Sequence, residues 1–402
     1  MKNNQLNKIN CKYLVILLVV LVFQEHGFNV VGWNAIVTIR HYLIFVIILA
    51  FFCLTKISRL NRNSCLDKTP IFLVLWSLLT SLLCISWGGE ILQEIPQTIN
   101  VVSLILFYYI NIYYEINEKT IIITFLIFGI LTALIQIIEQ FYPSIAIFGV
   151  FDYDSEYYGN IATMRNNLFR LKVGSSILQM FCLFYVWGQL LKKITFIRVL
   201  MVLLFASSVY LYLTRQILIS VAFTICFSYF FVSKKKIPIG VPVIFLSAII
   251  LIANYWEALF GDFIKDYVSN TYTTDIRQEC ISATLSDIFN NPITALFGHG
   301  HLETERTQWW PKGYYMSDIG FVGQGWYFGI LWIYVYFYTL YKYLIKYRKY
   351  IPVYIKLFLI STGVISISIF PYTKGSTFLL WGCMLYICFI YTRKNVKLQD
   401  HE

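Results

Sequence analysis

The chain has 402 residues, of which 58% are hydrophobic, 18% aromatic and only 13% charged, and its mean hydropathy is +0.65. Soluble domains are typically about 45–50% apolar and about 25% charged, so this composition excludes cytosolic enzymes, nucleic-acid-binding modules and disordered chains. It indicates an all-α polytopic integral membrane protein, with a single membrane domain over residues 1–402.

Apolar stretches long enough to cross about 30 Å of hydrocarbon as helices recur along the chain. The sequence predicts about twelve transmembrane helices, at residues 13–33, 38–56, 70–87, 98–114, 120–141, 172–191, 196–213, 216–232, 237–256, 320–341, 351–370 and 376–392. The first stretch is the weakest, because Gln24, Glu25 and His26 interrupt it, and a shorter anchor is the alternative. No small-residue cleavage site follows it, so we do not expect a cleaved signal peptide.

The distribution of basic residues orients these spans. With both termini in the cytoplasm, most of the 32 Lys and Arg residues fall on the inner side, as the positive-inside rule requires. We interpret the clusters Lys234–Lys236 and Lys342–Lys349 as topology signals. The net charge of +11 therefore reflects membrane insertion and indicates no nucleic-acid partner.

Two long loops then lie outside the cell membrane, at residues 142–171 and 257–319. Both loops are rich in aromatic residues, so we expect them to fold, and long loops are commonly functional. No phosphate-binding loop is found on the inner side, which places any chemistry outside. Cys280 is the one cysteine outside, so the chain offers no internal extracytoplasmic disulfide.

Positive charge in these outer segments opposes the orientation rule and needs a reason. The candidates are Arg165 and Arg170 before the sixth span, Arg215 in the turn between spans seven and eight, and Arg277 in an amphipathic stretch. Guanidinium groups bind phosphate oxygens in a bidentate manner, so these four arginines are candidates for binding a lipid pyrophosphate. The alternative is that each contacts lipid headgroups or pairs with a nearby acid.

Residues 297–305, FGHGHLETE, place His299 and His301 two residues apart. A neutral imidazole can accept the proton of a hydroxyl, so each histidine is a candidate general base. A metal site needs a third ligand and is not expected. A solvated loop without chemistry is the remaining alternative.

Asp318 precedes the tenth span, where it can act as a helix N-cap, with Ser317 as the neighbouring candidate. The competing role is a catalytic carboxylate that orients or deprotonates an acceptor hydroxyl. Asp152, Asp154 and Glu156 form an acidic cluster beside aromatic rings, which suits either a sugar-binding loop or a solvated loop tip.

The pattern resembles the Wzy-like O-antigen or capsular polysaccharide repeat-unit polymerases, within the superfamily of O-antigen ligases and polymerases. Most of the resemblance is architectural, in the spans and the two outer loops. Four local matches add to it: the stretch Arg165–Gly174, the segment Thr214-Arg215-Gln216, Asn291-Pro292 followed by Phe297-Gly298-His299-Gly300, and Ser317-Asp318-Ile319-Gly320 followed by Gly329-Ile330.

The resemblance implies a glycosyltransferase in the cytoplasmic (inner) membrane of a bacterium. It would join undecaprenyl-pyrophosphate-linked oligosaccharide repeat units into surface polysaccharide, with no cofactor and no metal. His299, His301 and Asp318 are then the catalytic candidates. Besides the bilayer and the lipid-linked oligosaccharides, the implied partners are a chain-length regulator and a flippase.

Three alternatives stay open. An O-antigen ligase would use the same donor, but ligases carry a His-Asn pair where this chain has Ser317-Asp318. A flippase would need ionisable residues deep within spans, where Glu139 and Lys356 are nearly alone. A structural or receptor-like membrane protein is the third.

Overall fold

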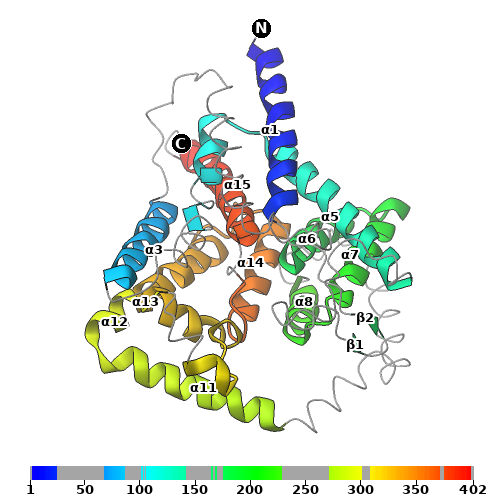
Figure 1. Ribbon diagram of the computed structural model, residues 1–402. Coiled ribbons are helices and arrows are strands. Elements are labelled where there is room, and N and C mark those ends of the chain that lie inside the picture. The colour runs from blue at the N-terminus through cyan, green and yellow to red at the C-terminus, as the bar shows by residue number, and fades with distance from the viewer. Residues whose placement is uncertain are drawn as a thin grey trace. The chain divides into compact units, whose positions relative to one another are not determined.

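The computed structural model describes residues 2–24, 68–86, 101–102, 104, 106–141, 164–165, 168–169, 175–228, 271–300, 308–371 and 375–399 (Figure 1). Over these residues the chain is helical, apart from one short pairing of two-residue strands. The strands β1 (Met164–Arg165) and β2 (Leu168–Phe169) pair antiparallel, with Arg165 opposite Leu168. The prediction of a helical chain is therefore confirmed.

The helices have the following bounds: α1 Lys2–Gln24, α3 Thr69–Ser86, α5 Glu118–Phe141, α6 Ser176–Leu190, α7 Phe196–Leu211, α8 Arg215–Ser228, α11 Thr271–Asn290, α12 Pro292–Phe297, α13 Gly320–Tyr341, α14 Val353–Ile365 and α15 Gly375–Gln399. Short 3₁₀ turns cover Trp310–Lys312 and Met316–Asp318, and a π-helical turn at Lys342–Lys346 continues α13. Polar caps fix several starts: the Ser175 side chain accepts from Ile177 N–H before α6, and Thr195 accepts from Arg198 N–H before α7.

Three helical stretches in the described residues are long and apolar enough to cross a membrane, at Thr69–Ser86, Glu118–Phe141 and Gly320–Lys346. Shorter apolar helices occupy Asn10–Leu21, Ser176–Leu190, Phe196–Leu211, Arg215–Ser228, Val353–Ile365 and Thr377–Arg393. These stretches lie within or beside nine of the predicted spans. The predicted spans 38–56 and 237–256 lie outside the described residues. The first helix begins at Lys2, well before residue 13, so the polar residues that precede the predicted span are helical too.

The chain forms two compact units. One comprises Met1–Cys53, Lys119–Thr271 and Pro352–Ser361. Its core packs the Phe181 ring edge-on against Phe125 and Phe358, with ring centroids 5.6 and 5.4 Å apart. Buried polar side chains link its helices, since Gln179 Nε2 donates to the Gly129 carbonyl at 3.0 Å and Ser208 Oγ donates to Gln136 Oε1 at 2.7 Å. Such bonds between helices are typical of membrane-embedded bundles.

The other unit comprises Leu54–Glu118, Tyr272–Ile351 and Thr362–Glu402. Its centre is aromatic: the ring of Trp332, on α13, lies 6.2 Å from Trp381 on α15 and 5.5 Å from Phe370. The Trp332 Nε1–H donates to Ser77 Oγ on α3 at 3.1 Å. This unit contains α11, α12 and α13, and two of the sequence candidates lie beside these helices: His299 follows α12, and Asp318 ends the turn before α13.

Candidate functional site

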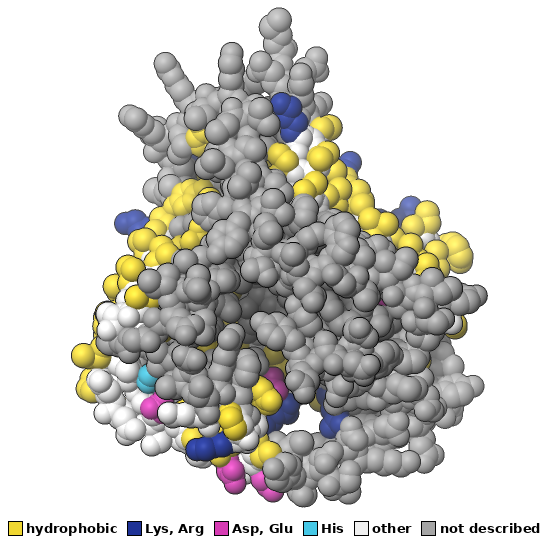
Figure 2. Space-filling view, in the orientation of Figure 1, with side chains coloured by type: hydrophobic (Ala, Val, Ile, Leu, Met, Phe, Trp, Pro, Cys, Tyr) yellow, Lys and Arg dark blue, Asp and Glu magenta, His cyan; other side chains and the backbone are white. Residues whose placement is uncertain are grey.

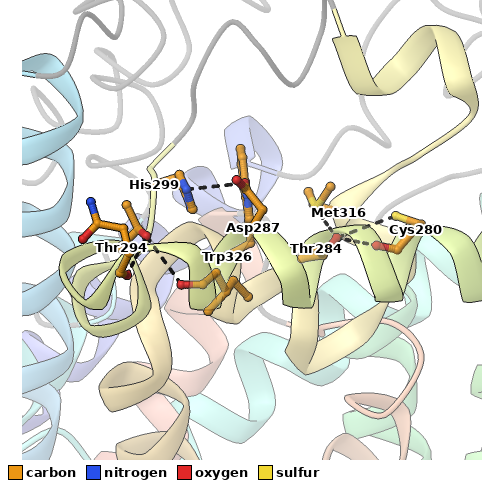
Figure 3. A network of polar contacts seen from close by, with 9 residues as sticks. Cys280, Thr284, Asp287, Thr294, His299, Met316 and Trp326 are labelled. Atoms are coloured by element: carbon orange, nitrogen blue, oxygen red, sulfur yellow. Dashed lines mark hydrogen bonds and ion pairs between the residues drawn. The ribbon is translucent and has the colours of Figure 1, made fainter.

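Helix α11 presents one buried face to its unit. Cys280, Thr284 and Ile288 recur at helical spacing and are almost fully buried. Thr284 Oγ1 donates to the Cys280 carbonyl at 2.6 Å and contacts Met316 Sδ at 3.6 Å, which fixes α11 against the turn before α13 (Figure 3). Cys280 is therefore a packing residue of this face, buried and not in a disulfide.

The sequence ends α11 and starts α12 within two residues. Asn291 is the N-cap of α12, where its side chain accepts from Ile293 N–H at 2.9 Å, and Pro292 occupies the first turn. Gly298 ends α12 with φ +80°, and a Cβ atom there would overlap the Tyr327 carbonyl oxygen. Only glycine combines this backbone conformation with so close an approach.

Helix α13 is interrupted at Gly329, which has φ 81° and ψ 167° inside the helix. The interruption frees carbonyl groups that the segment after α12 then satisfies. His299 N–H donates to the Trp326 carbonyl at 2.7 Å, and Gly300 N–H donates to the Tyr327 carbonyl at 3.0 Å. The broken helix therefore holds the backbone of His299 in place.

The His299 side chain points at an acid on α11 (Figure 3). Its Nε2 lies 3.4 Å from Oδ2 of Asp287, and the same Oδ2 accepts from the Trp326 Nε1–H at 2.7 Å. The imidazole stacks on the Trp326 indole, with ring centroids 4.9 Å apart and planes 14° apart. Asp287 and Trp326 thus hold the imidazole from the edge and from the face.

The surroundings of His299 leave it neutral at neutral pH. Burial lowers the pKa of His299, and the Asp287 carboxylate and the Trp326 carbonyl oppose this by raising it. The side chain is only 12% exposed, and among the described residues Nδ1 is buried without a hydrogen-bond partner. A carboxylate beside Nε2 favours the tautomer with the proton on Nε2, which places the lone pair of the imidazole on the buried Nδ1.

Aromatic side chains extend this site. The Trp309 ring lies 5.8 Å from Trp326 and 6.1 Å from the ring of Tyr314. The Tyr314 hydroxyl donates to Glu279 Oε2 at 3.1 Å. Rings with polar groups at their edges suit a ligand that has apolar faces and hydroxyl edges, as sugars do.

Arg277 and Asp318 form a second pair near the start of α11. Arg277 Nη2 lies 4.0 Å from Asp318 Oδ2, and both side chains are 47% exposed. Arg277 and Asp287 are separated along α11 by about 15 Å at the rise of an α-helix. The structure therefore brings Arg277 to Asp318, and it brings His299 to Asp287, but the two pairs form separate ends of one surface.

The capping prediction for Asp318 was wrong. Asp318 ends the turn Met316–Asp318, and the residue before α13 is Ile319, with no side-chain cap. Phe321 N–H instead donates to the Ser366 carbonyl at 2.7 Å, so the backbone after α14 satisfies the start of α13. The Asp318 carboxylate instead pairs with Arg277 and accepts a hydrogen bond from the Ser317 hydroxyl, at 3.3 Å to Oδ1.

The remaining candidates are placed as follows. Arg215 is the first residue of α8, and Leu213, two residues earlier, has a positive φ of 49°. A cation at a helix N-terminus opposes the helix dipole, so helix stability does not explain Arg215. The backbone of Arg165 lies in β1. Arg170, His301 and the acidic cluster Asp152, Asp154 and Glu156 lie outside the described residues.

Metal ligation was not expected from the sequence. In the described part of the chain no group of three or more His, Cys, Asp or Glu side chains is arranged to hold a metal ion. His301, Glu303 and Glu305 are not among those residues.

Asp287 and Trp326 were not among the sequence candidates. Asp287 follows Thr284 and Cys280 at helical spacing on α11, with its side chain 37% exposed, and an acid at that spacing from apolar positions is the signal that would have found it. Trp326 carried no such signal, because it is one aromatic residue within an apolar span.

Comparisons of the chain with protein-family models, with curated proteins and with solved structures find no match.

Proposed function

We propose that the chain is a Wzy-like polymerase, which joins undecaprenyl-pyrophosphate-linked repeat units into surface polysaccharide at the outer face of the bacterial cytoplasmic membrane. The observation that carries this proposal is the pairing of His299 with Asp287 against Trp326. A buried neutral imidazole held by a carboxylate is the arrangement of a general base. The apolar helices and the resemblance of the sequence motifs supply the membrane context.

The reaction needs one proton acceptor and one leaving group. A hydroxyl of the acceptor repeat unit gives its proton to His299 Nδ1, and its oxygen bonds to the anomeric carbon of the donor chain. The bond between that carbon and the pyrophosphate oxygen breaks, and undecaprenyl pyrophosphate leaves with the bonding electrons. Asp287 stabilises the imidazolium that forms, as carboxylates do for catalytic histidines.

The two ends of the α11 surface suit different parts of the substrates. The departing pyrophosphate must lie near the carbon that the hydroxyl attacks, whereas Arg277 lies about 15 Å along the helix from Asp287. Arg277 therefore binds a phosphate remote from that carbon, such as the one at the far end of the lipid-linked acceptor. Arg165, Arg170 and Arg215 remain the sequence candidates for the charge of the departing pyrophosphate.

Reconstitution tests this proposal. Lipid-linked repeat units are extracted from a strain that lacks the gene and mixed with the purified protein in nanodiscs. We expect a glycan ladder and one undecaprenyl pyrophosphate released for each added unit. General bases contribute about 10²–10⁴-fold, so His299→Ala should slow extension at least about a hundredfold.

Two variants serve as controls for this experiment. His301→Ala tests the other sequence candidate for the base, and we expect it to keep extension near the wild-type rate. Asp275→Asn, on an exposed turn of α11, should also leave extension unchanged. Wild-type rates in the His299→Ala variant, with loss in His301→Ala, would reject His299 as the base.

A further inference from the structure

The junction of α11 and α12, residues 285–297, carries an apolar surface that no protein element covers in the described part of the chain. We propose that this junction inserts into the outer leaflet of the bilayer, with its apolar side chains among the lipid acyl chains. The partner is thus a phospholipid surface. This inference concerns membrane contact and holds whether or not the chain is a polymerase.

Within each of the two helices the exposed apolar side chains of the junction lie three or four residues apart. Leu285 is 38% exposed, Phe289 64%, Ile293 52% and Leu296 44%. The earlier turns of α11 expose Asp275, Arg277 and Glu279 instead. Polarity therefore changes along α11, from a charged first half to an apolar end that continues into α12.

Asp287 is the one charged residue of the junction, and it is held by His299 and the Trp326 Nε1–H. No Asp, Glu, Lys or Arg occurs between Asp287 and Glu303. The polar Asn291 is satisfied locally, because its side chain caps α12. Thr294 Oγ1 donates to the Asn291 carbonyl at 2.9 Å. Few polar groups would therefore lose hydration without compensation on insertion.

Contacts of α12 fix its depth against two helices that are candidate spans. Thr80 Oγ1 on α3 donates to the Phe297 carbonyl at 2.7 Å, and the Trp76 ring stacks on Phe297 with centroids 4.8 Å apart. On the other side, a Cβ on Gly329 would overlap the Leu296 carbonyl oxygen. The path along α13 from Gly320 to Gly329 is about 14 Å, so the end of α12 lies beside the interior of a span.

The apolar surface continues onto those spans. Leu75, Leu79 and Leu82 are exposed on α3, and Ile330 and Tyr334 are exposed on α13. Figure 2 shows hydrophobic side chains along the side of the molecule where α3 and α12 lie. A helix that crosses hydrocarbon exposes such residues to lipid, and the same lipid reaches the junction beside it.

Photo-crosslinking tests this inference. The photoreactive amino acid p-benzoylphenylalanine replaces Phe289 or Ile293 in the full chain, and the purified protein is placed in nanodiscs of radiolabelled phosphatidylcholine. Asp275 and Glu279, on the charged half of the same helix, are the matched control positions. Irradiation is followed by measurement of the lipid bound to the protein.

For a junction buried about 5–10 Å into the boundary of headgroups and acyl chains, we expect at least about fivefold more lipid adduct at positions 289 and 293 than at 275 and 279. Equal lipid adduct at all four positions would overturn the inference. So would crosslinks from positions 289 and 293 that join two copies of the chain instead of lipid. The experiment needs no sugar substrate, so its outcome is independent of the polymerase proposal.

Discussion

The Asp287 carboxylate both holds the candidate base, His299, in position and affects its proton affinity. Its carboxylate lies 3.4 Å from His299 Nε2 and raises the pKa of His299, against burial, which lowers it. A general base works only when neutral, so the rate falls as the pH drops through the pKa of the imidazole. The acid side of the pH–rate profile therefore reports the environment of His299.

We expect Asp287→Asn to slow chain extension by up to about 10⁴-fold and to move the acid limb of the profile to lower pH. The asparagine oxygen can still accept from Trp326, but the charge that raises the pKa of His299 is lost. Rates of ladder growth between pH 5 and 8 give both quantities. An acid limb that stays at the wild-type pH, with an equal loss of rate at every pH, would show that Asp287 acts on structure alone.

Arg277 makes a different prediction, because its pair with Asp318 is half exposed. Exposed ion pairs contribute about 0–1 kcal/mol to stability, so Arg277→Ala should change the free energy of unfolding by less than about 1 kcal/mol. We expect the same variant to raise the KM for the lipid-linked acceptor about tenfold or more, through lost phosphate contacts. Lys312→Ala, which removes another exposed cation of the same unit, is the control. Equal KM values in both variants would remove Arg277 from the phosphate site.

At the scale of elements, the interruption of α13 positions the site. Gly329 has a positive φ, and its missing Cβ leaves room for the Leu296 carbonyl of α12. Gly325 lies one turn earlier, where a Cβ would meet Ile333 at 3.7 Å and Ile288 at 4.0 Å, both ordinary contacts. The two glycines of one helix therefore differ in what an alanine would do.

We expect Gly329→Ala to destabilise the protein by about 1–3 kcal/mol and to lower chain extension with it. Gly325→Ala should be neutral or slightly stabilising, since alanine favours the helix. Thermal unfolding in detergent measures both. Similar melting temperatures for the two variants would mean that the close approach of α12 and α13 does not constrain the native state.

Periodicity and hydropathy predict local structure well in this chain. The span predicted at 320–341 is α13 itself, and the prediction of a helix at 120–141 differs from α5 by two residues at its start. Hydropathy could not show that α13 breaks at Gly329, because a single glycine hardly changes the mean hydropathy of an apolar span. The break depends on α12, which packs there from a distant part of the sequence.

The sequence predicted only part of the site, because the other part depends on contacts between residues distant in the sequence. His299 stood out because histidine is rare in this chain and lies between two glycines. Its partner Asp287 is separated from it by all of α12, and only the turn at Asn291 brings the two together. The pairing of Arg277 with Asp318 is likewise a tertiary contact, which spacing along the chain does not encode.

At the scale of the whole molecule, the orientation of the spans decides where the chemistry takes place. The predicted topology puts residues 257–319 outside. Reporter fusions after Lys312 should therefore be active for an extracytoplasmic enzyme such as alkaline phosphatase. Fusions after Lys236 should be active for a cytoplasmic reporter. The reverse pattern would place His299 and Arg277 in the cytosol, where the proposed lipid-linked substrates are not polymerised.

The surface glycan of a deletion strain tests the polymerase proposal most directly. Gel separation of the glycan should show the full ladder in wild type, a single repeat unit in the deletion strain, and a restored ladder when the wild-type gene is returned. Restoration should fail with His299→Ala although the protein reaches the membrane. A full ladder in the deletion strain would contradict the proposal, and so would the complete absence of repeat units or the accumulation of long chains on the lipid carrier.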